Sequence, residues 1–195
     1  NLNISIDKTY YIPDFRKGAI FRKNPDLCVA GGKGVNVARV LRTLNVKSTV
    51  FGFCMGNIGK LIIKKLKEEK IYYRIVYQKE GESRTCITIA DKNGITTDIN
   101  EEGTDISSAS YEKFIKIIVD EIPKYKYLCI SGRTIKGADD NLYTKIIEVS
   151  KKNNLRTYAD ITGRFLEISI KKGIETVKIN SKEFFEITGK KNTVK

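Results

Sequence analysis

The sequence has no histidine and no tryptophan, and it contains only 3 prolines and 1 methionine among 195 residues. The absence of histidine excludes Ser-His-Asp triads and histidine general bases, so any acid–base chemistry must use Asp, Glu, Lys, Tyr or Cys. The 4 cysteines form no C-x-x-C pair, and each lies alone in an apolar stretch: Cys28, Cys54, Cys86 and Cys129. We therefore expect no zinc site, but reduced thiols in the core or in a pocket wall.

Long hydrophobic runs are also absent. No stretch approaches the ~20 apolar residues that cross a bilayer, and residues 1–7 alternate between polar and apolar side chains instead of forming a signal peptide. The composition, with 41% hydrophobic and 30% charged residues, is typical of a globular domain large enough to bury a core. We expect a soluble, cytoplasmic protein with no membrane partner.

Acidic residues are too few to balance the basic ones, which leaves a formal net charge of +13. Such a charge attracts polyanions. The lysines are nevertheless spread along the chain, as at 64–70, and no basic stripe interleaved with aromatic residues is present. We interpret these lysines as surface residues and expect no nucleic-acid partner, while small phosphorylated substrates would be attracted by the same field.

Strands and helices alternate along most of the chain. Hydrophobic periodicity predicts strands at 2–7, 48–53, 126–130, 156–160 and 174–179, and helices at 35–44, 57–70, 110–121, 139–152, 164–172 and from Ser181 onward. Asn45 is a suitable helix stop because Asn tolerates the left-handed conformation. This order predicts an α/β fold with a doubly wound, mostly parallel sheet flanked by helices.

Two segments do not fit this alternation. The first, 8–16, reads as a short strand that Pro13 moves towards a sheet edge. The second, 83–100, contains two alternating runs around Asn93-Gly94, which is a strong hairpin signal. We expect both to form a separate, small antiparallel sheet or flap.

The stretch Gly31-Gly32-Lys33-Gly34 stands directly before a predicted helix. It matches neither the Walker loop nor the dinucleotide fingerprint, because Gly34 follows Lys33 and Val37 takes the place of the third glycine. Backbone amides at a helix start, with Lys33 and Asn36 beside them, suit an anionic or hydroxyl-rich ligand. A tight turn in which the glycines only permit positive φ explains the same pattern, and the spacing alone leaves both interpretations open.

Polar residues stand at the predicted carboxyl ends of several strands, where ligands bind in open parallel sheets: Asp7, Ser131-Gly132, Asp160 and Asn180. Such residues can also serve only as helix N-caps. Asn180 and Glu183, spaced as in a capping box, are the strongest example of this alternative.

Seven short segments together resemble one family. They are "NISID" (3–7), "AGGKGVNV" (30–37), "SRTCI" (83–87), "TDIN" (97–100), "SGRTIKG" (131–137), "DITG" (160–163) and "KINSKEF" (178–184). In this order they resemble the ribokinase-like (PfkB) carbohydrate kinases, and within them the branch of 1-phosphofructokinases and tagatose-6-phosphate kinases. The resemblance extends over the whole chain.

The resemblance implies a role for each matching residue. The residues implied in substrate binding are Asp7, Gly31, Gly32, Lys33, Gly34 and Asn36 at the sugar, with Arg84 and Ser131 at the sugar phosphate. Those implied on the nucleotide side are Lys178 and Asn180 at the phosphates and Glu183 at Mg²⁺, through water. The implied substrates are a phosphorylated ketohexose and ATP with Mg²⁺. Segments 8–24 and 83–100 would form a lid that closes over the sugar and pairs two subunits as a homodimer.

The chain also departs from the family pattern. Ile4, Ile135 and Ile179 replace prolines, and Arg133 and Thr134 replace the Ser-Leu pair of the S-G-S-L-P-x-G loop. Losing prolines removes no ligand, so we expect altered rather than abolished binding. The family's G-x-G-D motif, which carries the catalytic Asp, does not occur in residues 1–195. We therefore expect a partial ribokinase-like domain without the C-terminal part of the fold and with no catalytic Asp in this chain.

We expect the activity to be ATP-dependent phosphorylation of a ketohexose monophosphate, with fructose 1-phosphate as the first choice. The resemblance implies tagatose 6-phosphate as the alternative, because kinases of that sugar often have a Cys two residues after the Arg, as Cys86 follows Arg84 here. A non-catalytic sugar-phosphate-binding module is the alternative from another class, and a basic nucleic-acid-binding protein is a weaker one.

Overall fold

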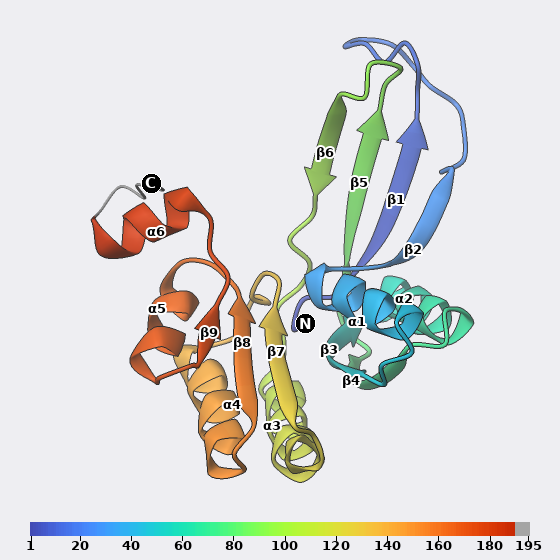
Figure 1. The fold of residues 1–195 in the computed structure, drawn as a ribbon. Coiled ribbons are helices and arrows are strands. Elements are labelled where there is room, and N and C mark those ends of the chain that lie inside the picture. Colours follow the sequence, from blue (N-terminus) through green and yellow to red (C-terminus); the bar gives the residue numbers. More distant parts are fainter. Residues whose placement is uncertain (190–195) are drawn as a thin grey trace.

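The computed structural model describes residues 1–189 and shows a layered α/β body with a lid of strands above it (Figure 1). The strands are β1 (Ser5–Tyr11), β2 (Leu27–Gly31), β3 (Thr49–Met55), β4 (Tyr72–Gln78), β5 (Arg84–Ala90), β6 (Thr96–Asn100), β7 (Tyr127–Ser131), β8 (Arg156–Asp160) and β9 (Thr176–Val177). The helices are α1 (Lys33–Thr43), α2 (Gly56–Glu68), α3 (Ser108–Glu121), α4 (Asp140–Lys152), α5 (Arg164–Lys171) and α6 (Ser181–Thr188), with a 3₁₀ turn, η1, at Ile122–Lys124.

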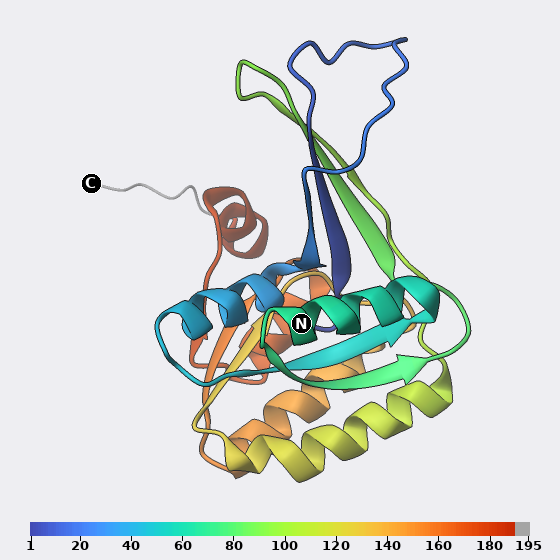
Figure 2. The ribbon, with the colours of Figure 1, turned by 90° about the vertical axis from the view of Figure 1, so that its right-hand side faces the viewer.

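The body strands pair in parallel, as the alternation of strands and helices predicts. One sheet contains β3 and β4, and the other has the order β7-β8-β9. Residues before β1 lie along β3, where Asn3 forms a parallel bridge to Phe53. In Figure 2, α1 and α2 cover one side of the body strands, and α3 and α4 cover the other side. The predicted α/β class with flanking helices is confirmed.

Two hydrophobic clusters hold these layers together. The first includes Ile6 of β1, Val35 of α1 and Ile62 of α2, all of them fully buried. The second, larger cluster packs the body strands against α3, α4 and α5, and in it the rings of Phe53 and Phe114 lie 4.6 Å apart. Burial of each such side chain contributes about 1.5–3 kcal/mol. Packing on both sides of the body strands therefore holds the elements that carry the lid.

The lid is one four-stranded sheet with the order β2-β1-β5-β6. Its outer pairs, β1 with β2 and β5 with β6, are antiparallel. Its central pair, β1 with β5, is parallel, with Ser5 opposite Arg84 and Asp7 opposite Cys86. The lid is therefore mixed rather than purely antiparallel, and it includes residues 27–31 as well as the expected segments. The hairpin expected at Asn93-Gly94 is confirmed.

Several predicted boundaries were wrong. The strand expected to end at Asp7 and the separate strand expected at 8–16 are a single strand, since β1 runs to Tyr11 while paired to a neighbour on each side. Asp7 therefore lies inside a strand and not at its end. No strand was predicted for β2 or for β4. The strand predicted at 174–179 is only Thr176–Val177.

Other local predictions are confirmed. The strand at 156–160 is β8, and Asn45 follows the last turn of α1 with φ 58°. Within residues 1–189, no helix has both the length and the apolar character needed to cross a bilayer.

The four cysteines are free thiols in different surroundings. Cys54 is buried, Cys28 and Cys86 are half-buried, and Cys129 is exposed. The expectation of core or pocket-wall thiols is met by Cys54 in the core, by Cys28 packed against it and by Cys129, which lines a cavity, and not by the half-buried Cys86 of the lid. Burial raises the pKa of Cys54 to about 12, so this thiol stays protonated at neutral pH.

The start of α2 is capped from the lid side rather than by its own residues. The Glu82 carboxylate accepts hydrogen bonds from the amides of Asn57, at 3.1 Å, and Ile58, at 2.8 Å. The first turn of α2 has no acidic residue, so Glu82 supplies both the acceptor and the negative charge that a helix N-terminus favours.

We predict that Glu82→Ala lowers the free energy of unfolding by about 1–2 kcal/mol, because two helix-start amides lose their acceptor. Urea or thermal unfolding measures this change. Glu80→Ala is the matched control, since the Glu80 carboxylate has no hydrogen-bond or ion-pair partner in the described chain. Equal losses in the two variants would contradict the capping role.

Candidate functional site

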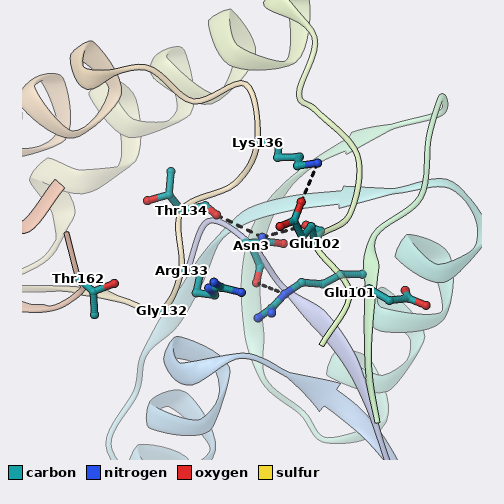
Figure 3. Close-up of a pocket in the computed structure, with 9 residues that line it drawn as sticks. Asn3, Glu101, Glu102, Gly132, Arg133, Thr134, Lys136 and Thr162 are labelled. Carbon is teal, nitrogen blue, oxygen red and sulfur yellow. Dashed lines mark hydrogen bonds and ion pairs between the residues drawn. The ribbon is translucent and has the colours of Figure 1, made fainter. Parts of the chain in front are cut away.

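A polar pocket opens where the lid meets the body (Figure 3). It has a volume of about 260 Å³ and is lined by Asn3, Arg84, Glu101, Glu102, Gly132, Arg133, Thr134, Lys136 and Thr162. These residues come from the segment before β1, the start and exit of the lid hairpin, the loop after β7 and the loop after β8. The pocket therefore joins parts of the chain that are far apart in sequence.

Asn3 ties these parts together. Its side chain is buried, and its Nδ2 donates to the carbonyl oxygen of Thr134, at 3.3 Å, and to that of Glu102, at 3.4 Å. Its backbone oxygen accepts a hydrogen bond from Arg84 Nε at 3.3 Å. One residue thus contacts the loop after β7, the exit of the lid hairpin and the start of β5.

The loop after β7 is also fixed by contacts to α4 and to the segment before α3. The hydroxyls of Thr134 and Tyr143 lie 2.9 Å apart, and the amide of Ile106 donates to the carbonyl oxygen of Lys136. Tyr143 lies in α4 and is fully buried, and burial raises its pKa to about 12, so it stays a neutral phenol. The backbone beside the pocket is fixed by these contacts on two sides.

Arg84, expected at the sugar phosphate, lies in this pocket. It is the first residue of β5 and is only 8% exposed. A guanidinium so placed offers its remaining N–H donors to the cavity in a planar fork that suits a phosphate.

Ser131, the other residue expected at the phosphate, does not line the cavity. It is the last residue of β7, is buried, and its Oγ has no hydrogen-bond partner among the described residues. Arg133, which the resemblance gave no role, lines the pocket instead.

The glycine stretch lies beside Asp7 at the foot of the lid. Ser5 Oγ donates to Asp7 Oδ1 at 2.6 Å. A β-carbon at Gly31 would overlap the Asp7 carboxylate, and Gly32, the N-cap of α1, has φ +101°. A side chain is therefore excluded at both positions, so the tight turn considered above is present, and it leaves the peptide of Gly31 directly against a carboxylate.

Three further expected residues lie at the start of α1, each with a different contact. Lys33 Nζ lies 3.2 Å from Asp160 Oδ1 at the end of β8. The amide of Gly34 donates to the side chain of Asn1 at 3.3 Å. Asn36 Oδ1 accepts from Arg39 Nη1 at 2.5 Å, which leaves its NH₂ group without a partner in the described chain.

The residues expected on the nucleotide side follow β9. Lys178 Nζ lies 3.5 Å from Asp160 Oδ1, the same oxygen that Lys33 contacts. Asn180 and Glu183 form a complete capping box: the Asn180 side chain accepts from the Glu183 amide at 2.9 Å, and the Glu183 carboxylate accepts from the Asn180 amide at 2.8 Å. The capping interpretation is thus confirmed as a geometry.

Acidic residues do not gather around Glu183. Within residues 1–189, no three Asp, Glu, His or Cys side chains lie close enough together to hold a metal ion. Magnesium commonly keeps several waters and binds through one or two carboxylates plus substrate phosphates. A single carboxylate acting through water therefore fits Mg²⁺ that arrives with a nucleotide, and does not fit a permanent metal centre.

The sequence motifs assign no role to Asn3 or Arg133. They include Asp160 but do not predict that this residue contacts two lysines. Asn3 opens the "NISID" segment, so its place in the motif was a usable signal. The contact of Asp160 with both Lys33 and Lys178 required the fold, because these residues are 127 and 18 positions away from it.

Comparisons with known proteins agree with this arrangement. The sequence model described as "pfkB family carbohydrate kinase" matches residues 4–195. Among solved structures, a possible 1-phosphofructokinase from Thermotoga maritima is 29% identical, with a TM-score of 0.83, and the match covers 93% of this chain and 59% of that one.

Phosphofructokinase-2 from Escherichia coli, solved in complex with fructose-6-phosphate, is 22% identical with a TM-score of 0.88. That match covers 99% of this chain and 64% of the other, and at this identity it supports the fold alone. The chain thus spans about three fifths of the length of these proteins. Since the family model matches nearly every residue of the sequence, the chain belongs to the pfkB family of carbohydrate kinases.

Proposed function

We propose that this chain forms the sugar-phosphate side of a kinase that transfers a phosphoryl group from Mg-ATP to a ketohexose monophosphate. The observation that carries the proposal is the buried Arg84 in a polar pocket between the lid and the body. An arginine there needs an anionic partner, and a sugar phosphate supplies one while its hydroxyls reach the neighbouring glycine turn. Fructose 1-phosphate is the first candidate.

The sugar hydroxyls are proposed to bind Asp7 and Asn36, beside the peptides of Gly31, Gly32 and Gly34. Asp7 keeps Oδ2 and part of Oδ1 as acceptors, since the Ser5 hydroxyl is its hydrogen-bond donor. Asn36 presents a donor, because Arg39 occupies its oxygen. A carboxylate and an amide with opposite hydrogen-bond character suit a polyol, whose hydroxyls both donate and accept.

The nucleotide phosphates are proposed to lie near Lys178 and the start of α6. Asn180 begins that helix, and a helix N-terminus favours negative charge. Asp160 contacts both Lys33 and Lys178, one lysine on each side of the proposed reaction. Both lysines are more than half exposed in their side chains, so an arriving phosphate can draw either of them from Asp160.

The general base is proposed not to be among residues 1–195. Asp160 Oδ1 already contacts the ammonium groups of Lys33 and Lys178, so this oxygen is not free to accept from a substrate hydroxyl. Asp7 lies inside β1 against the Gly31 peptide, where it is suited to hold hydroxyls. With no histidine and no G-x-G-D motif, the sequence offers no better candidate.

The lid is proposed to pair with the lid of a second copy. Several large apolar side chains of the lid are exposed: Tyr11, Ile20, Leu27, Ile95 and Ile99. Exposed apolar groups are typical of an interface, and Tyr11, Leu27 and Ile99 lie in strands of the lid while Ile20 and Ile95 lie in its connecting loops.

Two alternatives to a fructose 1-phosphate kinase are compatible with the same site. Cys86, two residues after Arg84, favours tagatose 6-phosphate over fructose 1-phosphate as the acceptor. A sugar-phosphate-binding module without turnover would use the same pocket and differ only in lacking catalysis.

We predict that Arg84→Ala weakens binding of fructose 1-phosphate about 10- to 150-fold, since a charge-assisted hydrogen bond contributes roughly 1.5–3 kcal/mol. Binding of unphosphorylated fructose should hardly change. Calorimetry with both sugars measures the difference. Equal phosphosugar affinity in variant and parent would remove Arg84 from the site.

We predict that Glu183→Gln, in a turnover-competent protein containing this sequence, shifts the Mg²⁺ dependence of the rate with little change in melting temperature. Glutamine can keep the capping box, whereas the charge is lost. Asn180→Ala, in contrast, should cost about 1 kcal/mol of stability as a lost cap. An unchanged Mg²⁺ titration in Glu183→Gln would leave only the capping role.

We predict that a mass-verified polypeptide of residues 1–195 binds phosphosugar but shows no kinase turnover. The assay uses ATP with fructose 1-phosphate, tagatose 6-phosphate or fructose 6-phosphate, and phosphosugar binding by the same sample serves as the folding control. Turnover above ~1 s⁻¹, within the usual range of enzymes, would show that a residue of this chain acts as the base.

A further inference from the structure

Two arginines line the polar pocket, and they come from different parts of the fold. Arg84 begins β5, while Arg133 lies in the loop after β7. Figure 3 shows the Arg133 side chain extending into the pocket towards Asn3, whose backbone oxygen accepts from Arg84. Both guanidinium groups thus reach the same cavity of about 260 Å³.

The carboxylates of the pocket are engaged elsewhere. Glu102 Oε2 lies 2.8 Å from Lys136 Nζ, and this lysine, with a smaller effect of Arg133, holds the pKa of Glu102 below its usual value. Glu101 Oε2 accepts from the Thr85 amide at 2.8 Å, and in Figure 3 its carboxylate points away from the other pocket residues.

Neither arginine has a carboxylate within ion-pair distance in the described chain. Among residues 1–189, the Arg84 guanidinium makes one hydrogen bond, from Nε to the Asn3 oxygen, and the Arg133 guanidinium makes none. Two like charges that share a small pocket repel each other, and the buried one has lost part of its hydration. An anion between them would remove both penalties, and a phosphate offers enough oxygens for two planar forks.

The backbone of the loop that carries Arg133 is held in place, whereas the Arg133 side chain is exposed. Thr134, the next residue, is held by Tyr143 through its hydroxyl and by Asn3 through its carbonyl oxygen. The backbone at Arg133 is therefore preorganised, and only side-chain torsions must be ordered when an anion binds.

We propose that Arg133 is a second phosphate ligand, which together with Arg84 grips the phosphate monoester of the substrate from two sides. This rests on the proposed function, and it adds a residue where the family pattern described above has a small hydroxyl side chain. Two guanidinium groups favour a dianion over a monoanion. Affinity should therefore fall as the pH drops through about 6, where a phosphate monoester takes up a proton, since arginine itself keeps its charge.

The test is calorimetry on this chain with fructose 1-phosphate, inorganic phosphate and fructose. Arg133→Ser restores the hydroxyl of the family pattern and should weaken binding of both phosphates by about 5- to 50-fold, with fructose unaffected. Arg133→Lys keeps the charge but loses the fork, so it should lie between Ser and the parent. Arg156→Ser, at the far end of β8 and exposed, is the charge-matched control and should change nothing.

The outcomes separate this inference from the proposed function. Fructose 1-phosphate binding that depends on Arg84 but is the same in Arg133→Ser and Arg156→Ser would overturn the role of Arg133 and leave the function intact. Inorganic phosphate binding that depends on Arg133, with no gain for the phosphosugar, would support the arginine pair and overturn the function. A folded parent that binds neither phosphate would overturn both.

Discussion

The buried amide of Asn3 is the contact on which the geometry of the site depends. A buried amide without partners costs about 1–3 kcal/mol, and Asn3 avoids this by donating to Thr134 and Glu102. Those two acceptors belong to the loop after β7 and to the exit of the lid hairpin, so satisfying one side chain fixes two loops. The Asn3 backbone oxygen also accepts a hydrogen bond from Arg84 Nε. These contacts of Asn3 fix the position of the lid relative to the body at the mouth of the pocket.

The same constraint supports the proposed binding of an anion in the pocket. Asn3 holds Arg84 at a neutral carbonyl oxygen, which orients the guanidinium without neutralising it. Glu102 in the same pocket is paired with Lys136, so within residues 1–189 Arg84, at 8% exposure, has no carboxylate partner. A carboxylate partner would neutralise Arg84 and leave it less available to a phosphate. A buried charge without such a partner is typical of functional sites.

The sequence predicts most of the alternation of body elements because those helices and strands are amphipathic or apolar over their own length, although it misses β4 and makes β9 too long. It fails at β1, where the polar Asp7 suggests a strand end, although pairing with both β2 and β5 continues past that residue. Motif order singles out Arg84, which lies in the pocket, but it gives no role to Arg133. Arg133 becomes a candidate only because it lines the same pocket as Arg84, which is 49 positions earlier in the chain. No local sequence pattern predicts that pocket.

Local placement of charge, and not the net charge of +13, decides which anion this surface can select. At physiological salt, exposed charges are screened beyond about 8 Å, so most of the dispersed lysines add attraction without direction. Lys33 and Lys178 differ from these dispersed lysines because both contact the same oxygen, Oδ1 of Asp160. One carboxylate thus holds two positive charges and neutralises only one of them. The surplus positive charge lies between the proposed sugar and nucleotide sides, where a transferring phosphoryl group would be most negative.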